Sequence, residues 1–510
     1  MGEIISADTI VGIVGAGAMG SGIAQLVATA GHRVRLLDSR AGAVDQAITD
    51  IGLALSQGVD KGKLDATAAQ AAQARLLAAS RLDELSDCGL VIEAIVEDLT
   101  AKQRLFSDLE ALVSAECLFA TNTSSISVTA IGAALRSPQR LAGLHFFNPA
   151  PRMALVEVIS GLATDPGLAD TLRATALAWG KTPVTARSTP GFIVNRVARP
   201  YYGEALRLLD EGAGDAATLD AIFREAGGFR MGPFELMDLI GLDVNLAVST
   251  SVWRAFHHDP RYAPSLIQQE LVAAGYLGRK SGRGFHRYGD NVAPASANTL
   301  PLQPALPSPA LVFAEGPLAE SLRDRLQARG LPFQHAGTSP DGRVAEAGGA
   351  VLYVTDGRTA TERAARKGVS NTVLVDLALD YGKATRLAIA TAEQCSPAAA
   401  GAAAGLLQTA GFAVSRLADV AGLTVMRTVC MLANEAADAV HQSVCDAAAV
   451  DQAMLLGTHY PLGPLAWAEQ IGLRKVRRVL ANLAASYGED RYRVSPLLAR
   501  KVFSRTNFHA

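Results

Sequence analysis

The first part of the chain alternates between short apolar runs and longer stretches with helical spacing of apolar residues. The apolar runs of strand length lie at residues 9–14, 33–37, 90–94 and 117–122. Residues 21–30 and 100–113 carry apolar positions three and four apart, which is typical of an amphipathic helix. Strands that alternate with helices predict βαβ units, and therefore a parallel sheet covered by helices on both faces.

The passage from His145 to Val158 departs from this pattern. Pro149 and Pro151 lie in its middle, and proline lacks a backbone donor and restricts φ, so the passage cannot be a single helix. The pattern predicts a strand, a turn and a returning strand, and such a hairpin brings Glu157 beside His145. An imidazole oriented by a buried carboxylate is a general base. Taken alone, the passage is equally compatible with a core histidine whose partner is only structural.

Three glycines, Gly15, Gly17 and Gly20, join the first strand to the first helix. In a Gly-x-Gly-x-x-Gly loop the first permits a tight turn, the second lets the backbone approach a pyrophosphate, and the third lets helix and strand pack closely. The helix N-terminus offers free N–H groups and partial positive charge to phosphates. Asp38 ends the second strand, where a carboxylate accepts bonds from ribose hydroxyls and repels a 2′-phosphate. This order predicts a dinucleotide site for NAD rather than NADP.

Polar side chains follow the later strands of the same predicted sheet. Glu97 comes after the strand at 90–94, while Asn122 ends the strand at 117–122 and Ser124 follows it. Ligands of doubly wound sheets bind beyond the carboxyl ends of the strands, so we expect these residues on the cofactor side. His145 comes one strand later, where the nicotinamide should lie. The run from Asn122 is also compatible with a simple helix N-cap.

Composition excludes several classes of protein. A chain of 510 residues suggests three or four domains. The 49% apolar and 19% charged residues with net charge −2 are those of an ordinary globular protein and show no basic footprint for nucleic acid. No run approaches the roughly 18 apolar residues that span a bilayer. The five cysteines form no CxxC pair and no Cys/His cluster with metal spacing. We expect a reduced, cytoplasmic, metal-free protein without a membrane partner.

The second half contains an internal repeat. Residues 190–242 align without gaps with residues 421–473, so that Glu204 corresponds to Glu435 and Asn195 corresponds to Met426. The passage 291–309 is rich in Ala, Pro, Ser and Asn and predicts a linker. Strand-like runs then follow at residues 310–314, 350–354, 372–376 and 386–390. They alternate with helical patterns and predict a smaller α/β unit, which has no glycine fingerprint and for which we expect a structural role.

Taken together, these motifs resemble the 3-hydroxyacyl-CoA dehydrogenase family, NAD enzymes of fatty acid β-oxidation and related pathways. The matching words run in the family's order from residue 9 to about residue 290: Gly15–Ala24, Asp38, Val91–Glu97, Asn122–Ser125, Gly143–Pro151, Leu155–Val158, Thr189–Arg196, Met231–Leu236 and Gly278–Gly284. The resemblance implies an α/β fold with a Rossmann-type NAD-binding domain, an all-α dehydrogenase domain, a degraded α/β unit and a second all-α copy. The domain bounds that follow are 1–189, 190–290, 291–309 as linker, 310–418 and 419–510.

The resemblance also implies roles for individual residues. His145 takes the C3 hydroxyl proton of the substrate while hydride leaves C3 for NAD, and Glu157 holds that histidine. Ser124 and Asn195 contact the reacting oxygen region, and Asn148 helps to fix the base. The positions that match the cofactor side are Gly15, Gly17, Met19, Gly20, Asp38, Glu97, Lys102 and Asn122. Ser56 and Lys61 match the family's CoA-contacting segment, although the same residues would suit a solvated helix end.

Within this family the tandem helical domain and the run at 188–202 are similar to the bacterial dehydrogenases of phenylacetate catabolism, which act on 3-hydroxyadipyl-CoA. A 3-hydroxybutyryl-CoA dehydrogenase is the second candidate, and a non-catalytic NAD-binding relative is the third. An enzyme for free 3-hydroxy acids would be expected to use a lysine base, which His145 argues against. One-copy members pair through the helical domain, so we expect a homodimer or a pseudo-dimeric monomer. After Asn-Pro-Ala-Pro the family usually has an apolar residue, Met and then Lys, whereas this chain has Arg152, Met153 and Ala154. The basic residue has thus moved two positions, and Arg152 is a candidate contact for a distal carboxylate or a CoA phosphate.

Overall fold

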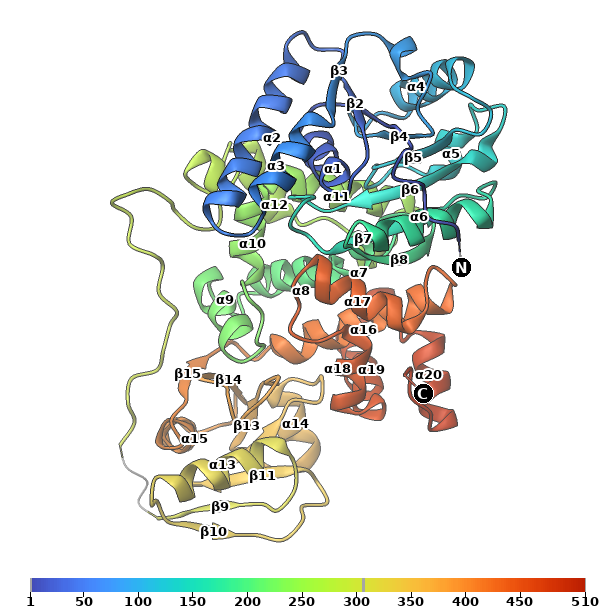
Figure 1. The fold of residues 1–510 in the computed structure, drawn as a ribbon. Helices are drawn as coiled ribbons and strands as arrows, with labels where there is room; N and C mark the ends of the chain where they lie inside the picture. Colours follow the sequence, from blue (N-terminus) through green and yellow to red (C-terminus); the bar gives the residue numbers. More distant parts are fainter. Residues whose placement is uncertain (1, 305–307, 510) are drawn as a thin grey trace. The chain divides into compact units, whose positions relative to one another are not determined.

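The computed structural model describes residues 2–304 and 308–509, and the chain divides into two compact units (Figure 1). The first unit runs to Arg196 and also includes Gln442–Thr458, and the second contains Val197–His441 together with the segment from His459 onward. The domain bounds expected from the sequence stay a prediction, and one segment groups differently in the two units. In particular, residues 442–458 lie within the second helical copy in sequence but pack with the first unit.

The first unit is built on an eight-stranded sheet in the order β3-β2-β1-β4-β5-β6-β7-β8. Its strands are β1 (Val11–Val14), β2 (Val34–Leu37), β3 (Leu76–Ala79), β4 (Leu90–Glu93), β5 (Leu118–Thr121), β6 (Leu141–Phe146), β7 (Leu155–Ser160) and β8 (Thr182–Arg187). All neighbours pair in parallel except β6 and β7. Every residue of β1 and β4 is buried, as expected of a parallel sheet covered on both faces. The predicted Rossmann-type sheet is therefore confirmed.

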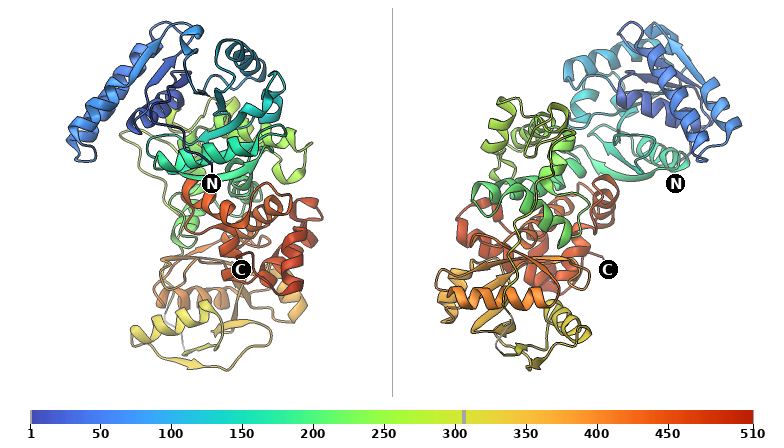
Figure 2. Two further views of the ribbon diagram at one scale, coloured as in Figure 1. Left: turned by 45° about the vertical axis from the view of Figure 1, so that its right-hand side comes forward. Right: turned by 90° about the vertical axis from the view of Figure 1, so that its left-hand side faces the viewer.

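Helices flank this sheet on both sides (Figure 2). They are α1 (Ala18–Thr29), α2 (Ala43–Asp60), α3 (Ala66–Ala74), α4 (Leu99–Leu112), α5 (Val128–Gly132), α6 (Pro166–Ala178), α7 (Val194–Val197) and α17 (Ala447–Gly457), with short 3-10 helices η1 (Leu82–Leu85) and η2 (Pro138–Arg140). α1 packs on α2 and α3, whereas α17 packs on β7 and β8. The turns that follow β1, β2, β4 and β5 lie at the carboxyl edge of these parallel strands, where the predicted site residues gather, whereas β7 and β8 run in the opposite direction.

The second unit contains the two helical copies. The first copy consists of α8 (Arg199–Asp210), α9 (Ala216–Glu225), α10 (Pro233–Ile240), α11 (Leu242–Ala255), η3 (Pro260–Tyr262), α12 (Leu266–Ala273) and η4 (Arg279–Ser281). The second has α16 (Val425–His441), α18 (Pro464–Ile471), α19 (Leu473–Tyr487), η5 (Asp490–Tyr492) and α20 (Pro496–Ser504). α10 and α18 begin and end at aligned positions, and each is followed by a glycine with positive φ, Gly241 and Gly472. The gapless repeat is confirmed at the level of individual helix ends.

The smaller α/β unit carries a seven-stranded mixed sheet in the order β10-β9-β11-β12-β13-β14-β15. Its elements are β9 (Ala310–Val312), α13 (Pro317–Ala328), β10 (Phe333–His335), β11 (Arg343–Ala347), β12 (Ala350–Val354), α14 (Ala360–Lys367), β13 (Thr372–Val375), β14 (Arg386–Thr391), α15 (Pro397–Thr409) and β15 (Ala413–Arg416). All four predicted strands are present. The expected linker has neither helix nor strand in its described part, and the Leu300 amide donates to the Val414 carbonyl at 2.8 Å.

Among the described residues, no single helix is both long and apolar enough to cross a membrane. The pair α10 and α11 reaches that length and composition only when the two helices are counted together across a bend of 100°.

Candidate active site

The hairpin of β6 and β7 places His145 directly opposite Glu157 in the antiparallel register. The two side chains meet with 2.7 Å between imidazole Nδ1 and carboxylate Oε2. Glu157 is fully buried and His145 is 6% exposed. A carboxylate that accepts the Nδ1 proton leaves Nε2 as the proton-accepting nitrogen and orients the ring. The predicted strand, turn and strand, with the two residues side by side, are confirmed.

The second carboxylate oxygen of Glu157 has partners of its own. Oε1 accepts hydrogen bonds from the backbone N–H groups of Ile193 and Val194, each at 3.0 Å. These groups open α7, so their donors are not used within the helix. A buried carboxylate is stable only when its oxygens are satisfied. Glu157 therefore joins the histidine to the segment that carries Asn195, a connection that the sequence did not reveal.

Aromatic rings surround the imidazole of His145. The ring centroids of Phe147 and Phe192 lie 4.5 Å and 6.0 Å from that of His145. Phe192 has a positive φ of 48°, an uncommon conformation for a bulky residue. Its repeat partner Leu423 has φ 55°, so this strained turn belongs to the architecture of both copies and is not a special feature of the histidine site.

A loop after β5 is organised by Glu97. Its Oε1 accepts from the backbone N–H of Ser124 at 2.9 Å and from the Thr123 hydroxyl at 2.7 Å. Burial opposes ionisation, but the Lys102 ammonium and these hydrogen bonds outweigh it and lower the pKa of the Glu97 carboxyl. The loop in turn meets Asn195, whose Nδ2 donates to the Ser124 carbonyl at 3.3 Å. Ser124 and Asn195, distant in sequence, are thus brought together.

Lys102 holds Glu97 in place through ion pairs. It is 1% exposed, and its Nζ lies 2.6 Å from Glu93 Oε1 and 3.2 Å from Glu97 Oε2. Asn122 Oδ1 accepts from the Phe146 amide at 2.8 Å and so ties the loop to the end of β6. Glu97, Lys102 and Asn122 lie on the expected rim. Their visible bonds position protein groups, and direct contact with a cofactor stays a prediction.

The glycine loop shows why each glycine is required. Gly15 has φ 108°, and a Cβ there would come 2.4 Å from the Ala94 carbonyl oxygen. A Cβ on Gly20 would lie 1.7 Å from the Gly15 carbonyl oxygen, so α1 and β1 could not pack as they do. By contrast, a Cβ on Gly17 meets nothing within 4 Å. Gly17 therefore faces open space that a phosphate group can approach closely.

That space belongs to a cavity of about 730 Å³. Its lining includes Gly15, Gly17, Asp38 and Ala94. Met19 lies in the first turn of α1, outside this lining. A dinucleotide thus has a cradle of bare backbone, a helix N-terminus and a carboxylate, and the residues present fit such a group.

Hydrogen bonds from neighbouring groups fix the Asp38 carboxylate. Its Oδ2 accepts from the Ala16 amide at 2.7 Å, and its Oδ1 accepts from Arg40 Nε at 3.1 Å. Burial opposes ionisation, yet the hydrogen bonds from Arg40 and Ala16 prevail and lower the pKa of Asp38 to about 2. The carboxylate is therefore charged at any physiological pH, as recognition of ribose hydroxyls requires.

Among the described residues, no hydrogen bond or ion pair links the remaining predicted residues to the histidine pair. Asn148 is exposed beyond the end of β6, and its side chain makes no hydrogen bond within the described chain, so the expected help in fixing His145 is not seen. Glu157 and the aromatic rings hold the imidazole instead. Ser56 and Lys61 are exposed at the C-terminal end of α2. Roles of these three residues toward substrate stay predictions.

The internal repeat gave no indication of a partial counterpart of Glu157 in the second half of the chain. Asp376 follows β13 and accepts from the backbone N–H groups of Thr424 at 2.9 Å and Val425 at 2.7 Å. These are the repeat partners of Ile193 and Val194. Burial raises the pKa of Asp376 to about 6. This carboxylate caps its helix as Glu157 does, but within the described part of the chain no histidine is bonded to it. Nothing in the sequence indicated it, because Asp376 follows β13 whereas Glu157 lies within β7, and both lie outside the aligned repeat.

Among the described residues, no group of three or more His, Cys, Asp and Glu side chains is arranged to hold a metal ion. The chemistry at this rim is therefore that of the histidine–glutamate pair, the Asn195–Ser124 contact and the neighbouring dinucleotide cradle.

Comparison with known proteins agrees with this chemistry. The NAD-binding domain model of 3-hydroxyacyl-CoA dehydrogenase matches residues 10–189, and the C-terminal domain model matches residues 191–288 and 422–507. The reduced Rossmann-fold domain of 3-hydroxybutyryl-CoA dehydrogenase matches residues 352–420.

Individual relatives extend over the whole chain. A 3-hydroxyadipyl-CoA dehydrogenase of Escherichia coli strain K12 is 41% identical over 98% of both chains. A 3-hydroxybutyryl-CoA dehydrogenase of Bradyrhizobium diazoefficiens is 40% identical over 54% of this chain and 94% of its own. A crystal structure described as 3-hydroxybutyryl-CoA dehydrogenase from Escherichia coli K12 superposes with a TM-score of 0.89 at 40% identity, covering 98% of this chain and 99% of that one.

The histidine–glutamate pair, the glycine cradle and these full-length matches lead to one conclusion: the chain belongs to the 3-hydroxyacyl-CoA dehydrogenase family and is an NAD-dependent enzyme of that family.

Proposed function

We propose that the chain oxidises (S)-3-hydroxyadipyl-CoA to the 3-oxoacyl thioester with NAD. The observation that carries this substrate is the 41% identity with the 3-hydroxyadipyl-CoA dehydrogenase over 98% of both chains, which includes both helical copies and the α/β unit between them. The butyryl-specific relative from Bradyrhizobium matches only 54% of this chain. 3-Hydroxybutyryl-CoA is the second candidate, because the full-length crystal structure bears that name.

In this proposal His145 accepts the proton of the C3 hydroxyl through Nε2. The Glu157 carboxylate, 2.7 Å from Nδ1, orients the ring and places a negative charge beside the imidazolium that forms. Asn195 supplies an uncharged amide donor to the reacting oxygen. The loop of Gly15 and Gly17 and the N-terminus of α1 would hold NAD, which supplies the acceptor for the hydride that leaves C3. The hydroxyl proton would thus go to His145, and the C3 hydride would go to NAD.

The substrate is tested by steady-state formation of NADH. We expect kcat/KM with 3-hydroxyadipyl-CoA to exceed that with 3-hydroxybutyryl-CoA by about tenfold or more, because a hydrogen bond to a charged group contributes about 1.5–3 kcal/mol. The free 3-hydroxy acid serves as the control for the CoA moiety. Equal or better turnover of the butyryl ester would overturn the adipyl assignment, and turnover of the free acid alone would overturn the thioester.

The distal carboxylate of the adipyl chain needs a cationic partner, and we propose Arg152. Arg152 is exposed on a turn. Lys181 fixes this turn, because its Nζ donates to the carbonyls of Ala150 at 2.6 Å and Met153 at 2.8 Å. Arg152→Ala should raise KM for the adipyl ester about tenfold and leave KM for the butyryl ester unchanged. If both KM values rise together, Arg152 contacts the CoA phosphates; if neither changes, it is only a surface charge.

Cofactor selectivity gives a further prediction. Asp38→Ser removes the charge that repels a 2′-phosphate and releases Arg40, whose guanidinium now lies 3.1 Å from that carboxylate. We expect KM for NAD to rise about tenfold or more and NADP to become a usable cofactor. The double change Asp38→Ser with Arg40→Ala is the control, because it removes the candidate phosphate ligand. An unchanged preference for NAD in Asp38→Ser would show that Asp38 does not select the cofactor.

The two helical copies make reciprocal contacts that support a monomer. The Tyr492 hydroxyl donates to Glu204 at 3.0 Å, and the Tyr262 hydroxyl donates to Glu435, the repeat partner of Glu204, at 2.6 Å. Arg427 adds a fully buried ion pair to Glu204 at 2.8 Å. Exchange of the same contact in both directions is the signature of a two-fold interface. We propose that the second copy occupies the surface through which one-copy relatives pair.

This arrangement predicts the mass of the particle in solution. Light scattering should give about the chain mass of 53.2 kDa across a wide range of protein concentrations. Twice that mass at every concentration would show that the chain still dimerises through another surface.

A further inference from the structure

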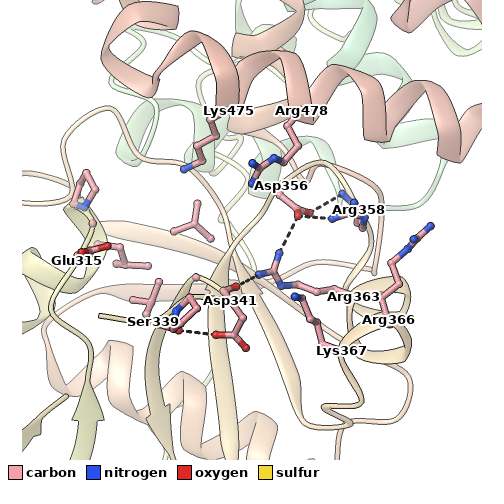
Figure 3. Close-up of a pocket in the computed structure, with 17 residues that line it drawn as sticks. Glu315, Ser339, Asp341, Asp356, Arg358, Arg363, Arg366, Lys367, Lys475 and Arg478 are labelled. Carbon is pink, nitrogen blue, oxygen red and sulfur yellow. Dashed lines mark hydrogen bonds and ion pairs between the residues drawn. The ribbon is translucent and has the colours of Figure 1, made fainter. Parts of the chain in front are cut away.

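A second cavity lies in the smaller α/β unit, at the carboxyl ends of β9 and β12 (Figure 3). It has a volume of about 660 Å³. Residues Glu315–Leu318 follow β9 and contribute to its wall, as do Val354 and Asp356 at the end of β12. β9, α13 and the parallel β10 repeat the order of β1, α1 and β2, so this cavity lies where an open α/β sheet binds its ligands.

The lining of this cavity is strongly basic. Its cationic side chains are Arg358, Arg363, Arg366, Lys367, Lys475 and Arg478, against three carboxylates, Glu315, Asp341 and Asp356. In Figure 3 the basic side chains come from two helices, α14 and α19, and from the loop after β12. A concave site lined by one sign of charge concentrates ions of the opposite sign.

The carboxylates present do not neutralise these cations. Asp356 is shared by Arg358 at 2.7 Å and Arg363 at 2.9 Å. Asp341 is paired with Arg343 outside the lining. Within the described chain, Lys367, Lys475 and Arg478 of the lining make no ion pair. Glu362, outside the lining, pairs with Arg366 at 2.7 Å, so among the described residues three of the six lining cations have no carboxylate partner.

Two polar atoms of these side chains are wholly or partly shielded from water and have no hydrogen-bond partner among the described residues. Arg363 is 8% exposed, and its Nε is buried with no hydrogen-bond acceptor. Lys475 on α19 makes no hydrogen bond or ion pair within the described residues, and Figure 3 shows its ammonium on the cavity side. Burial lowers the pKa of Lys475. A shielded donor without an acceptor costs free energy, so an anion that accepts from these atoms would stabilise this unit.

We propose that this cavity binds a phosphorylated small molecule of nucleotide size through its basic side chains. Guanidinium groups bind phosphate oxygens in pairs and ammonium groups bind them as point charges. The first cavity, with its bare glycine backbone, measures 730 Å³, and this one is comparable at 660 Å³. Here the helix after β9 begins with Gly316 and Pro317, and proline offers no N–H. Side chains therefore replace the glycine loop as the phosphate ligands.

A diphosphate could be that of a free nucleotide or the phosphorylated adenosine end of CoA, and the probes separate them. Calorimetric titrations of the full chain with saturating NADH, which fills the first cavity, would use pyrophosphate, ADP and CoA in turn. We expect binding at one site, weakened by salt. Tighter binding of ADP than of CoA identifies a free nucleotide, and the reverse order identifies CoA. Failure of all three probes to bind overturns the proposal.

Variants locate the binding. Lys475→Ala combined with Arg478→Ala should weaken the affinity at least tenfold and leave turnover of the acyl-CoA substrate unchanged. Arg474→Ala is the matched control, because Arg474 is exposed on the same helix and is not part of the lining. Unchanged affinity in the double variant would place the ligand elsewhere and overturn the proposal.

Lys475→Met distinguishes binding from a structural role. Methionine keeps the apolar stem but removes the unpaired charge, so the melting temperature without ligand should rise while the increase caused by ADP or CoA is lost. A fall in melting temperature without ligand, with the ligand-induced increase retained, would show that Lys475 only supports the fold. This test does not depend on which acyl chain the active site takes.

Discussion

Replacement of His145 by glutamine lowers kcat by about 10²–10⁴-fold, the usual range for loss of a positioned general base. Glutamine fits the space beside Glu157 and can donate to its carboxylate, but its amide does not accept the hydroxyl proton at neutral pH. The binding of NAD should remain, because Gly15, Gly17 and Asp38 form a separate cradle. The measurement is NADH formation with the acyl-CoA substrate, together with a direct titration of NAD.

A second histidine provides the matched control. His286 Nε2 lies 2.8 Å from the buried Asp220 carboxylate, a contact almost equal in length to that of His145 with Glu157. Burial opposes protonation, but the hydrogen bond that His286 donates to Asp220 prevails and raises the pKa of His286. His286→Gln should lower stability and leave kcat within about twofold, since surface and structural changes rarely alter chemistry. A kcat for His145→Gln within threefold of wild type would exclude His145 as the base.

Replacement of Glu157 by glutamine has the second largest expected effect. The amide can still accept from Ile193 and Val194, but its NH₂ group then faces His145 Nδ1 and donates to it. That bond moves the ring proton to Nε2, the nitrogen that must accept the substrate proton. Loss of charge and the wrong tautomer together should lower kcat by about 10²–10⁴-fold. Kinetics at saturating substrate and NAD measure this effect.

The same change also affects the fold. Hydrogen bonds to a charged group contribute about 1.5–3 kcal/mol, so Glu157→Gln should lower the free energy of unfolding by a similar amount. Asp376→Asn is the matched control, because Asp376 accepts backbone N–H groups at the aligned position but has no histidine partner. Asp376→Asn should lower the free energy of unfolding and leave kcat unchanged. If both variants lose only stability, Glu157 is a structural residue and the proposed dyad is wrong.

The local features of the site could be predicted because they depend on neighbours in the sequence. Two prolines between His145 and Glu157 leave a hairpin as the simple solution, and antiparallel pairing then sets the residues opposite each other. Gly15 and Gly20 are required by a backbone that runs from strand to helix within six residues. Such constraints act over short distances along the chain, so a pattern of residue types is sufficient evidence for them.

Contacts between distant segments could not be predicted in this way. Nothing near Lys102 indicates that its ammonium ends between Glu93 and Glu97. Likewise, the second copy in sequence gives no sign that α17 leaves it to pack on β7 and β8 of the first unit. Both the Lys102 contact and the position of α17 depend on how all helices and strands pack together in the folded chain.

The sequence by itself determined the Rossmann-type sheet, the glycine cradle, the histidine–glutamate hairpin and the gapless helical repeat, because strand and helix periodicity and turn chemistry are local properties. Only the tertiary structure decided that Glu157 also caps the segment of Asn195, that Asp376 keeps this capping role without a histidine, and that Lys475 faces a basic cavity without a partner. Burial and charge pairing are sums over residues far apart in sequence, so they exist only once the chain has folded.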